Sequence, residues 1–441
     1  MTRPSSTPAR QPFSPTHWIL LAILGGTLLG FLEQSQILAP GTTVPLGQIG
    51  LVIIRFIKGL ALPLVFFAVL DTLLRTSLDG RTALRFLLIC AFNACVAAAV
   101  ALSLLAVFDG GAEFSVSLRA LVESAENSGA SKDVLSRKTP NLVDVIGNLL
   151  PQNLIEPFAS NNILAIVVLA LLIGGAVRSL RRSDPDESCH ECRLIEQGAH
   201  AGALVTARLL RLCVRLVPLA VLGLIAQAVS KLGLSAFSAL GPFLMITLSG
   251  LAIHGLIYYP LAARFFSGRS ALDFLRGGRD AVIMAFAVNS SLATVPVTLR
   301  CLSRMGVRES SAHVSVLGGS NFNNDGIVLY EIMAALFLAQ GLGLQPDLAQ
   351  QGLLVVSSVL AAMGIAGVPE AGLVILPIVL GNSGFSEVVI AAVIPLVTPV
   401  DWLIGRCRSA VNVLGDMLGA CLLDRWSAAP RNPQPEPPPS E

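Results

Sequence analysis

One polar interruption within a long apolar run does most to limit what this chain can fold into. Residues 316–340 read VLGGSNFNNDGIVLYEIMAALFLAQ, so the polar, glycine-rich stretch 318–326 separates two apolar segments. Gly, Asn, Asp and Ser tolerate non-helical backbone, and this stretch therefore predicts a broken helix. At membrane depth, the carbonyls freed by such a break must be satisfied by protein, water or an ion. Together with Asn and Asp oxygens they suit a hard cation such as sodium, whereas a helix-ending turn at the membrane surface is the plainer alternative.

The composition places these flanking segments in a membrane. Of the 441 residues, 54% are hydrophobic and 13% are charged, and the mean hydropathy is +0.73. Because a soluble globular domain averages about 25% charged residues, we predict an all-α polytopic membrane protein. Most of the 8 cysteines lie in or beside apolar segments, where a thiol packs as a small apolar group. Cys189 and Cys192 form a lone CxxC without a second pair, so metal binding is the less favoured interpretation there.

Further apolar segments are separated by short basic loops. The apolar segments lie at 17–31, 49–74, 86–108, 163–177, 204–229, 240–262 and 388–423. The basic loops lie at 75–85, 178–182, 264–279 and 300–308. With eight full spans and two hairpins that enter and return, these loops fall on one side, which the positive-inside rule makes cytoplasmic together with both termini. Residues 1–15 and the Pro-rich tail 426–441 are expected to be disordered.

Two apolar segments are interrupted near their middle, at 289–296 and at 364–372. Each is about 20 residues long but too broken for a straight spanning helix, so we expect helical hairpins whose tips reach the midplane. The first hairpin precedes the break at 318–326 and enters from the cytoplasm, and the second follows it and enters from outside. Such paired interruptions indicate an inverted repeat around a transporter's binding site.

The last apolar segment carries ionisable residues, which are costly inside a membrane unless they are paired or hydrated. Asp401, Arg408, Asn412 and Asp416 recur at spacings that place them near one stripe of a helix. The planar guanidinium of Arg408 can bind both oxygens of a carboxylate, while Asn412 and Asp416 offer hard oxygens to a cation. We therefore predict a site for an anion together with sodium; an ion-pair network that only holds helices together is the alternative.

Four motifs identify a family resemblance. They are SSLATVPVTLR at 290–300, NNDG at 323–326 with Tyr330, GIAGVPEAG at 364–372 and RSAVNVLGD at 408–416. In this order they resemble the dicarboxylate/amino acid:cation symporters, the glutamate transporter family, and the resemblance extends over roughly residues 15–425. It implies eight transmembrane helices plus two re-entrant helical hairpins with inverted repeats, a homotrimer and an elevator-like transport domain.

The resemblance also divides the chain. Residues 16–235 correspond mainly to trimerisation and scaffold helices, with 82–108 belonging to the transport domain instead. Residues 236–425 correspond mainly to the transport domain. Within it the resemblance implies hairpin 1 at about 280–305, a broken helix at about 312–340, hairpin 2 at about 350–385 and a last helix at about 388–423.

Site residues are implied position by position. The substrate-binding set is Ser290, Ser291, Ile327, Val368, Gly372, Arg408 and Asn412. One sodium site corresponds to Gly319, Asn323, Asn412 and Asp416, a second to Asn323 and Asp325 with Asn93 from the third helix, and a third to the backbone at Ala362, Met363 and Ile365. Glu331 matches the glutamate to which proton transfer is assigned in proton-coupled animal members, so the implied coupling ions are Na⁺ and, through Glu331, H⁺.

Several positions depart from the family pattern. Asn324 replaces a methionine, Ile327 a threonine near the substrate, and Leu292 the third serine of a serine run. In the third helix, where the family offers Tyr, Thr and Ser to sodium, the corresponding residues are Cys90, Asn93 and Ala94.

Gly405 is the departure that bears most on the substrate. Amino acid transporters of the family place an aspartate there to hold the substrate's ammonium, and a glycine offers no countercharge. Losing that charge-assisted hydrogen bond costs about 1.5–3 kcal/mol for an ammonium ligand. We therefore predict a sodium-coupled carrier of a C4-dicarboxylate, with aspartate or glutamate as the alternative. Asp401 is a candidate replacement countercharge, and Arg406 is a further charged candidate beside it.

Other functional classes are less favoured. An anion channel is expected to line its pore with repeated elements, whereas a single Arg408 suits binding and release of one anion. A substrate sensor that no longer transports is a second alternative. The scattered histidines form no catalytic arrangement, so we predict no enzyme. The expected partners are the lipid bilayer, the small-molecule substrate and further copies of the chain in a homotrimer, with no nucleic acid, in the cell (inner) membrane.

Overall fold

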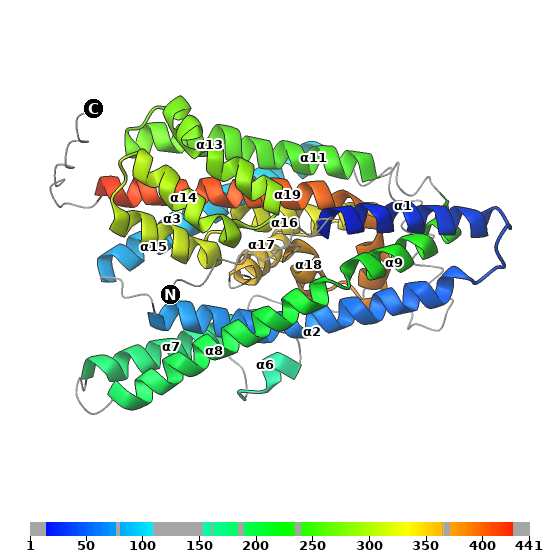
Figure 1. Ribbon diagram of the computed structural model, residues 1–441, viewed down its shortest axis with the longest axis horizontal. Helices are drawn as coiled ribbons and strands as arrows, with labels where there is room; N and C mark the ends of the chain where they lie inside the picture. Colours follow the sequence, from blue (N-terminus) through cyan, green and yellow to red (C-terminus); the bar gives the residue numbers. More distant parts are fainter. Residues whose placement is uncertain are drawn as a thin grey trace, which may run out of the picture.

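The computed structural model describes residues 15–75, 80–108, 153–159, 162–183, 189–233, 240–363, 365 and 371–426. Every regular element within these ranges is a helix, as the apolar periodicity predicts, and most helices lie along one common long axis (Figure 1). The two segments predicted to be disordered, 1–15 and 426–441, lie outside the described residues except for Pro15 and Trp426.

One group of helices falls almost entirely within residues 16–235, for which the scaffold role stays a prediction. Helix α1 packs along α9, and α2 packs along α7, α8 and α9, so that α2, α7 and α8 run side by side along the lower edge in Figure 1. Their faces away from this packing are apolar and exposed, for example at Leu24, Phe56 and Leu172, as expected of surfaces that meet lipid or another apolar partner. The bounds are α1 (Pro15–Gln34), α2 (Thr43–Arg75), α6 (Glu156–Ala159), α7 (Ile163–Ser183), α8 (Cys189–Val214) and α9 (Val217–Leu232).

The second group surrounds α19, which runs along the long axis through the body of the molecule (Figure 1). Helices α11, α13, α14, α15, α16 and α18 all pack against it. Helix α16 is buried along nearly its whole length, because it is apolar on every side and enclosed by α3, α17, α18 and α19. The bounds are α3 (Gly80–Val107), α11 (Leu240–Ala252), η1 (Ile253–Tyr258), α12 (Tyr259–Ala262), η2 (Ala263–Ser267), α13 (Ala271–Val288), α14 (Ser291–Arg304), α15 (Glu309–Phe322), α16 (Asp325–Gly341), α17 (Leu348–Ala362), α18 (Ala371–Asn382) and α19 (Glu387–Trp426).

Several of these helices are long and apolar enough to cross a bilayer. Among the described residues there are 4 by length and composition, or up to 5 if the bent pair α8–α9 counts as one span. The prediction of several apolar spans is therefore confirmed, while the full number of eight stays a prediction. The 204–229 segment, expected to be one span, instead contains a 46° bend between α8 and α9. Pro218 lies in the first turn of α9, which begins at Val217, and it lacks the N–H that would continue the hydrogen bonding of the preceding helix.

Two of the three predicted breaks lie within the described residues, and both are shorter than the sequence suggested; most of the third, at 364–372, lies outside them. Helix α15 continues through Gly318 and Gly319 to Phe322, and only Asn323 and Asn324 separate it from α16. The expectation of non-helical backbone throughout 318–326 was wrong, because the close packing around this segment overrides its low helix propensity. In hairpin 1 the helices break at Asn289–Ser290, whereas Pro296 lies inside α14.

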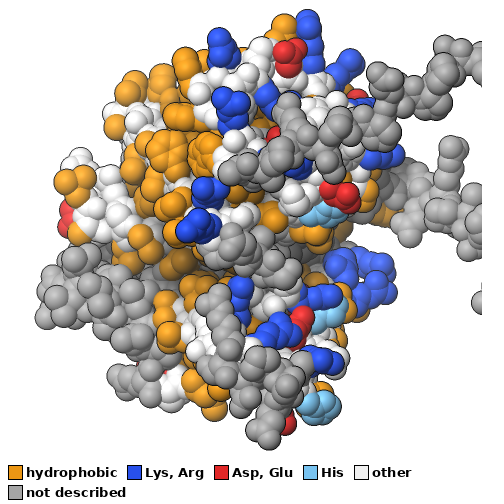
Figure 2. All heavy atoms as spheres, turned by 90° about the vertical axis from the view of Figure 1, so that its left-hand side faces the viewer, with side chains coloured by type: hydrophobic (Ala, Val, Ile, Leu, Met, Phe, Trp, Pro, Cys, Tyr) orange, Lys and Arg blue, Asp and Glu red, His pale blue; other side chains and the backbone are white. Residues whose placement is uncertain are grey.

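Several arginines lie at one end of the molecule. Arg85 at the start of α3 donates to the carbonyl of Trp426 at the end of α19 at 2.7 Å, and Arg308 at the start of α15 pairs with Asp424 at 2.7 Å. The turn between α14 and α15 therefore lies at the same end as the last turn of α19. Figure 2 shows Lys and Arg side chains spread over this end of the molecule, with few acidic residues between them.

Candidate functional site

A buried polar site lies where two helix breaks and the start of α18 meet α19. The breaks are those between α13 and α14 and between α15 and α16, and these four helices and α18 all pack against α19. Such burial of charged and amide groups is costly unless they are paired, hydrogen-bonded or bound to ions. The buried polar residues of these elements and of α3 include Asn93, Asn289, Ser290, Ser291, Asn323, Asn324, Asp325, Glu331, Asp401, Arg408, Asn412 and Asp416.

Arg408 is the anchor of the site. It is 3% exposed, and its Nη2 lies 3.0 Å from Oδ1 and 3.2 Å from Oδ2 of Asp401, two turns earlier on α19. Its guanidinium also lies over the ring of Tyr330, 4.1 Å from the centroid, which adds a cation–π contact. These contacts fix the plane of the guanidinium, which is the arrangement that recognises a carboxylate.

Hairpin 2 reaches the same arginine through Gly372. A Cβ placed on Gly372 would overlap Nη1 of Arg408, so the absence of a side chain is what allows α18 to approach the guanidinium. The predicted substrate residues Gly372 and Arg408 are therefore in contact. Val368, the other hairpin 2 residue of that set, lies outside the described residues.

Hairpin 1 contributes its tip. Ser290 is the N-cap of α14 and its hydroxyl accepts from the backbone N–H of Ala293 at 3.1 Å, so this predicted substrate contact also has a structural role. The hydroxyl of Ser291 is buried and has no hydrogen-bond partner among the described residues. Asn289 ends α13 with a φ of 51° and accepts a hydrogen bond from Ser409 of α19 at 3.1 Å. Sequence reasoning had not selected Asn289 as a site residue, although Asn is common in such left-handed caps.

Two buried carboxylates provide a place for a cation. Asp416 lies close enough to Gly319 that a Cβ there would overlap Oδ1 of Asp416, and the Asn323 amide is 3.4 Å from the same oxygen. No arginine or lysine of the described chain forms an ion pair with Asp416 or Asp325. Since buried charges need compensation, the two carboxylates fit a cation such as sodium, and Gly319, Asn323 and Asp416 are brought together as predicted, with the Asn323 amide nitrogen donating to Asp416. Asn412, the fourth predicted member, lies one turn before Asp416 on α19.

The second carboxylate has aromatic neighbours that sequence reasoning missed. Asp325 accepts from the Tyr259 hydroxyl at 2.6 Å and lies 3.6 Å from Nε2 of His254. Tyr258 donates to Oδ1 of Asn93 at 2.6 Å, and Asn93 in turn donates to Asn323 at 3.4 Å, so the predicted residue Asn93 joins this network. These tyrosines lie at the end of a π-helical turn, η1, which often occurs at functional sites and has no reliable sequence signal.

The remaining predicted residues have distinct surroundings. Glu331 is 0% exposed, and both its carboxyl oxygens have no hydrogen-bond partner among the described residues, so its role as a proton carrier stays a prediction. Arg406 donates to the carbonyls of Phe286 and Ala287 at the end of α13, 2.8 Å each. Ile327 is buried in the first turn of α16. Met363 ends α17, and Ile365 is buried beyond it.

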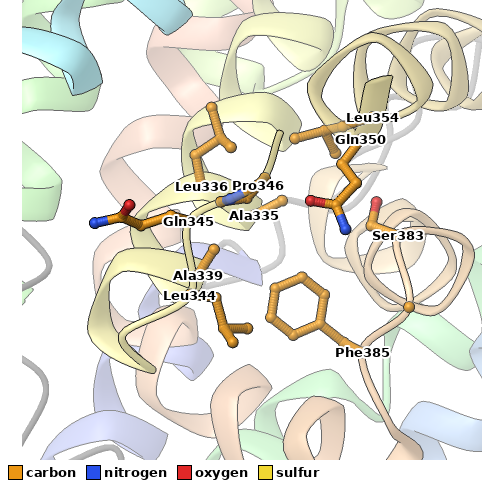
Figure 3. Close-up of a pocket in the computed structure, with 11 residues that line it drawn as sticks. Ala335, Leu336, Ala339, Leu344, Gln345, Pro346, Gln350, Leu354, Ser383 and Phe385 are labelled. Atoms are coloured by element: carbon orange, nitrogen blue, oxygen red, sulfur yellow. The ribbon is translucent and has the colours of Figure 1, made fainter. Parts of the chain in front are cut away.

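A separate pocket of about 170 Å³ lies at the base of hairpin 2, away from Arg408. Figure 3 shows that side chains from the end of α16, the start of α17 and the end of α18 surround it. Two of its polar side chains are engaged within the protein: Gln350 accepts from the N–H of Asp347 at 2.7 Å, and Ser383 donates to the carbonyl of Val379 at 2.7 Å. It is not part of the polar site.

Comparison with known proteins agrees with this geometry. Residues 16–426 match the model of the sodium:dicarboxylate symporter family. The chain is 32% identical over 268 residues to excitatory amino acid transporter 3 of Mus musculus, covering 60% of this chain and 49% of that protein. It is 29% identical over 324 residues to excitatory amino acid transporter 4 of Rattus norvegicus, covering 72% and 55%. It is 27% identical over 445 residues to neutral amino acid transporter B(0) of Oryctolagus cuniculus, covering 92% and 79%.

The chain thus matches about half the length of the first of these relatives, and their names refer to both acidic and neutral amino acids. The family match covers all the helices that build the polar site, from α3 to α19. The predicted resemblance and the prediction that the protein is not an enzyme are both confirmed. This chain belongs to the sodium:dicarboxylate symporter family, whose members are membrane symporters for dicarboxylates and amino acids.

Proposed function

We propose that this protein is a secondary active carrier that couples inward sodium movement to uptake of a C4-dicarboxylate. The proposal of a dicarboxylate substrate rests mainly on the neutral surface at position 405, where Gly405 offers no charged side chain. A Cβ on Gly405 would lie 3.1 Å from Nη2 of Arg408 and 3.3 Å from both carboxamide atoms of Asn289. Arginine and amide N–H groups favour an acceptor oxygen in this space, whereas an ammonium group would meet a cation and find no carboxylate at position 405.

The charge balance supports the same substrate. Asp401 pairs with Arg408 and lies two helical turns from it on α19, so it orients the guanidinium. Its use as the countercharge for a substrate ammonium would weaken this buried pair. The carboxylates Asp416 and Asp325 lie near the break between α15 and α16, where bound sodium offsets their charge and that of an entering dianion.

The wider transport model rests on family membership. It comprises a homotrimer, movement of the second helix group with its hairpins as an elevator, and a cell-membrane location. The arginine-rich end of the molecule supports a cytoplasmic assignment for that end by the positive-inside rule. Proton coupling through Glu331 is part of the same proposal. An acidic amino acid symporter remains the second candidate, and an anion channel or a sensor remains the candidate from another class.

The ligand specificity is tested on the purified protein. We expect succinate, malate or fumarate to raise the melting temperature in sodium but not in potassium, because a ligand that binds only the folded state stabilises it. L-Aspartate and L-glutamate are expected to give a much smaller rise. An equal rise with L-aspartate would make the protein an acidic amino acid symporter. Counterflow of labelled succinate into proteoliposomes separates a carrier from a sensor or a channel.

Asn289 provides a charge test of the same surface. Asn289→Asp is isosteric and keeps a residue type that tolerates the left-handed conformation, but it places a carboxylate beside position 405. We expect the affinity ratio of L-aspartate to succinate to rise by about tenfold or more, the equivalent of one charge-assisted hydrogen bond. Competition binding with labelled succinate measures the ratio. Asn153→Asp, which adds the same charge at an exposed position, is expected to leave it unchanged; an unchanged ratio in Asn289→Asp would contradict the assignment of this surface.

A further inference from the structure

The carboxamide of Asn324 connects hairpin 2 to the core of the site. Asn324 is 2% exposed and lies in the short break between α15 and α16. Its Nδ2 donates to the carbonyl of Ala362, the last residue of α17, at 2.9 Å. The same nitrogen lies 3.4 Å from the carbonyl of Ser320 and 3.3 Å from that of Asn321. One amide nitrogen is therefore surrounded by backbone carbonyl oxygens from α15 and α17.

The orientation of this amide follows from the hydrogen-bond network. The backbone N–H of Gly326 can only donate, and it lies 2.8 Å from Oδ1 of Asn412. The nitrogen of Asn412 therefore points the other way, 3.1 Å from Oδ1 of Asn324. It follows that Asn324 presents its nitrogen, and not its oxygen, to Ala362.

This arrangement does not fit the sodium site that the family resemblance implies at Ala362, Met363 and Ile365. A hard cation needs carbonyl oxygens whose lone pairs face a common space without a competing donor. Here the Ala362 carbonyl accepts from an amide N–H, and the donor occupies the side that faces the break. An amide nitrogen has no lone pair to offer a cation.

We propose that Asn324 replaces a sodium ion in this chain, so that hairpin 2 closes on the core through its amide and no sodium binds at Ala362, Met363 and Ile365. Like a bound cation, the neutral amide N–H group attracts carbonyl oxygens, and it thereby connects α15 and α17. Sodium coupling then depends on the carboxylate sites at Asp416 and Asp325. The inference rests on the proposed sodium-coupled transport, but it concerns the number of ions and not the identity of the substrate.

The test replaces the donor by an acceptor of the same shape. In Asn324→Asp, one carboxylate oxygen still accepts from Asn412, while the other faces the carbonyls of Ala362, Ser320 and Asn321. Repulsion between these oxygens is relieved by a cation or by protonation of the carboxyl group, and the measurement is made at alkaline pH, which favours the cation. Radioactive sodium binding to the purified full-length protein is expected to rise by about one ion per protomer, and the slope of log substrate affinity against log sodium concentration to rise by about one.

Two further variants keep the proposal falsifiable. Asn324→Ala removes the donor and leaves the carbonyl oxygens and a vacated space, so sodium is expected to stabilise it more strongly than the wild type in the absence of substrate. Asn153→Asp is the control for added charge and should bind as many ions as the wild type. Equal ion counts, slopes and sodium-dependent melting shifts in wild type, Asn324→Asp and Asn324→Ala would overturn the proposal. Because direct ion counting needs no substrate, a failure of the dicarboxylate assignment would show separately.

Discussion

Replacing Arg408 by lysine is expected to weaken dicarboxylate binding by about 100-fold, although the positive charge is retained. Lysine loses the planar fork that binds two carboxylate oxygens, and its single ammonium cannot meet Asp401, Tyr330 and the substrate at once. Removing one partner of a buried ion pair typically costs about 3–5 kcal/mol, and the retained charge recovers only part of this. Equilibrium binding of labelled succinate at saturating sodium measures the loss.

The control makes the same exchange at the surface. Arg304 pairs with Asp280 at 3.1 Å, with side chains 72% and 61% exposed. Because exposed ion pairs contribute about 0–1 kcal/mol, Arg304→Lys should leave both binding and melting temperature nearly unchanged. Succinate affinity within threefold of wild type in Arg408→Lys would mean that Arg408 is not the group that holds the substrate.

Adding one methyl group at Gly372 is expected to abolish transport. The Cβ of Gly372→Ala would occupy the position of Nη1 of Arg408, so either hairpin 2 is displaced or the guanidinium leaves its plane beside Asp401. Both outcomes disrupt the closed site. In catalytic sites, a positional error of about 1 Å already lowers the rate on the order of 100-fold. Counterflow of labelled succinate in proteoliposomes is expected to fall to background, with succinate affinity reduced in parallel.

Hairpin 2 offers a matched control on its other arm. A Cβ on Gly352 of α17 has no atom within 4 Å, so Gly352→Ala makes the same change in open space. It should retain wild-type counterflow, and its melting temperature should stay equal or rise slightly because alanine favours helix. Normal counterflow in Gly372→Ala would show that the contact between α18 and Arg408 is not required for the transport cycle.

The positions of the helix breaks illustrate what local sequence predicts well. Asn323–Asn324 and Asn289–Ser290 were found within the polar stretches that marked them, because a break needs residues that tolerate non-helical backbone. Their length was overestimated at Gly318 and Gly319, which stay helical within α15. There the requirement is for small residues at close contacts, of Gly318 with Phe86 and of Gly319 with Asp416, which a propensity argument does not contain.

The sequence by itself determined the membrane class, the all-helical architecture, the interrupted segments and the family, because hydropathy, residue type and motif order are properties of the chain alone. It also placed Arg408, Asn412 and Asp416 on one helix stripe. The tertiary structure decided the partners. It paired Arg408 with Asp401, placed Tyr259 and His254 beside Asp325, and aimed the amide of Asn324 at Ala362, 38 residues away in the sequence. The physical reason is that a hydrogen bond or ion pair depends on distance and direction between groups, and the packing of α15, α17 and α19 sets both.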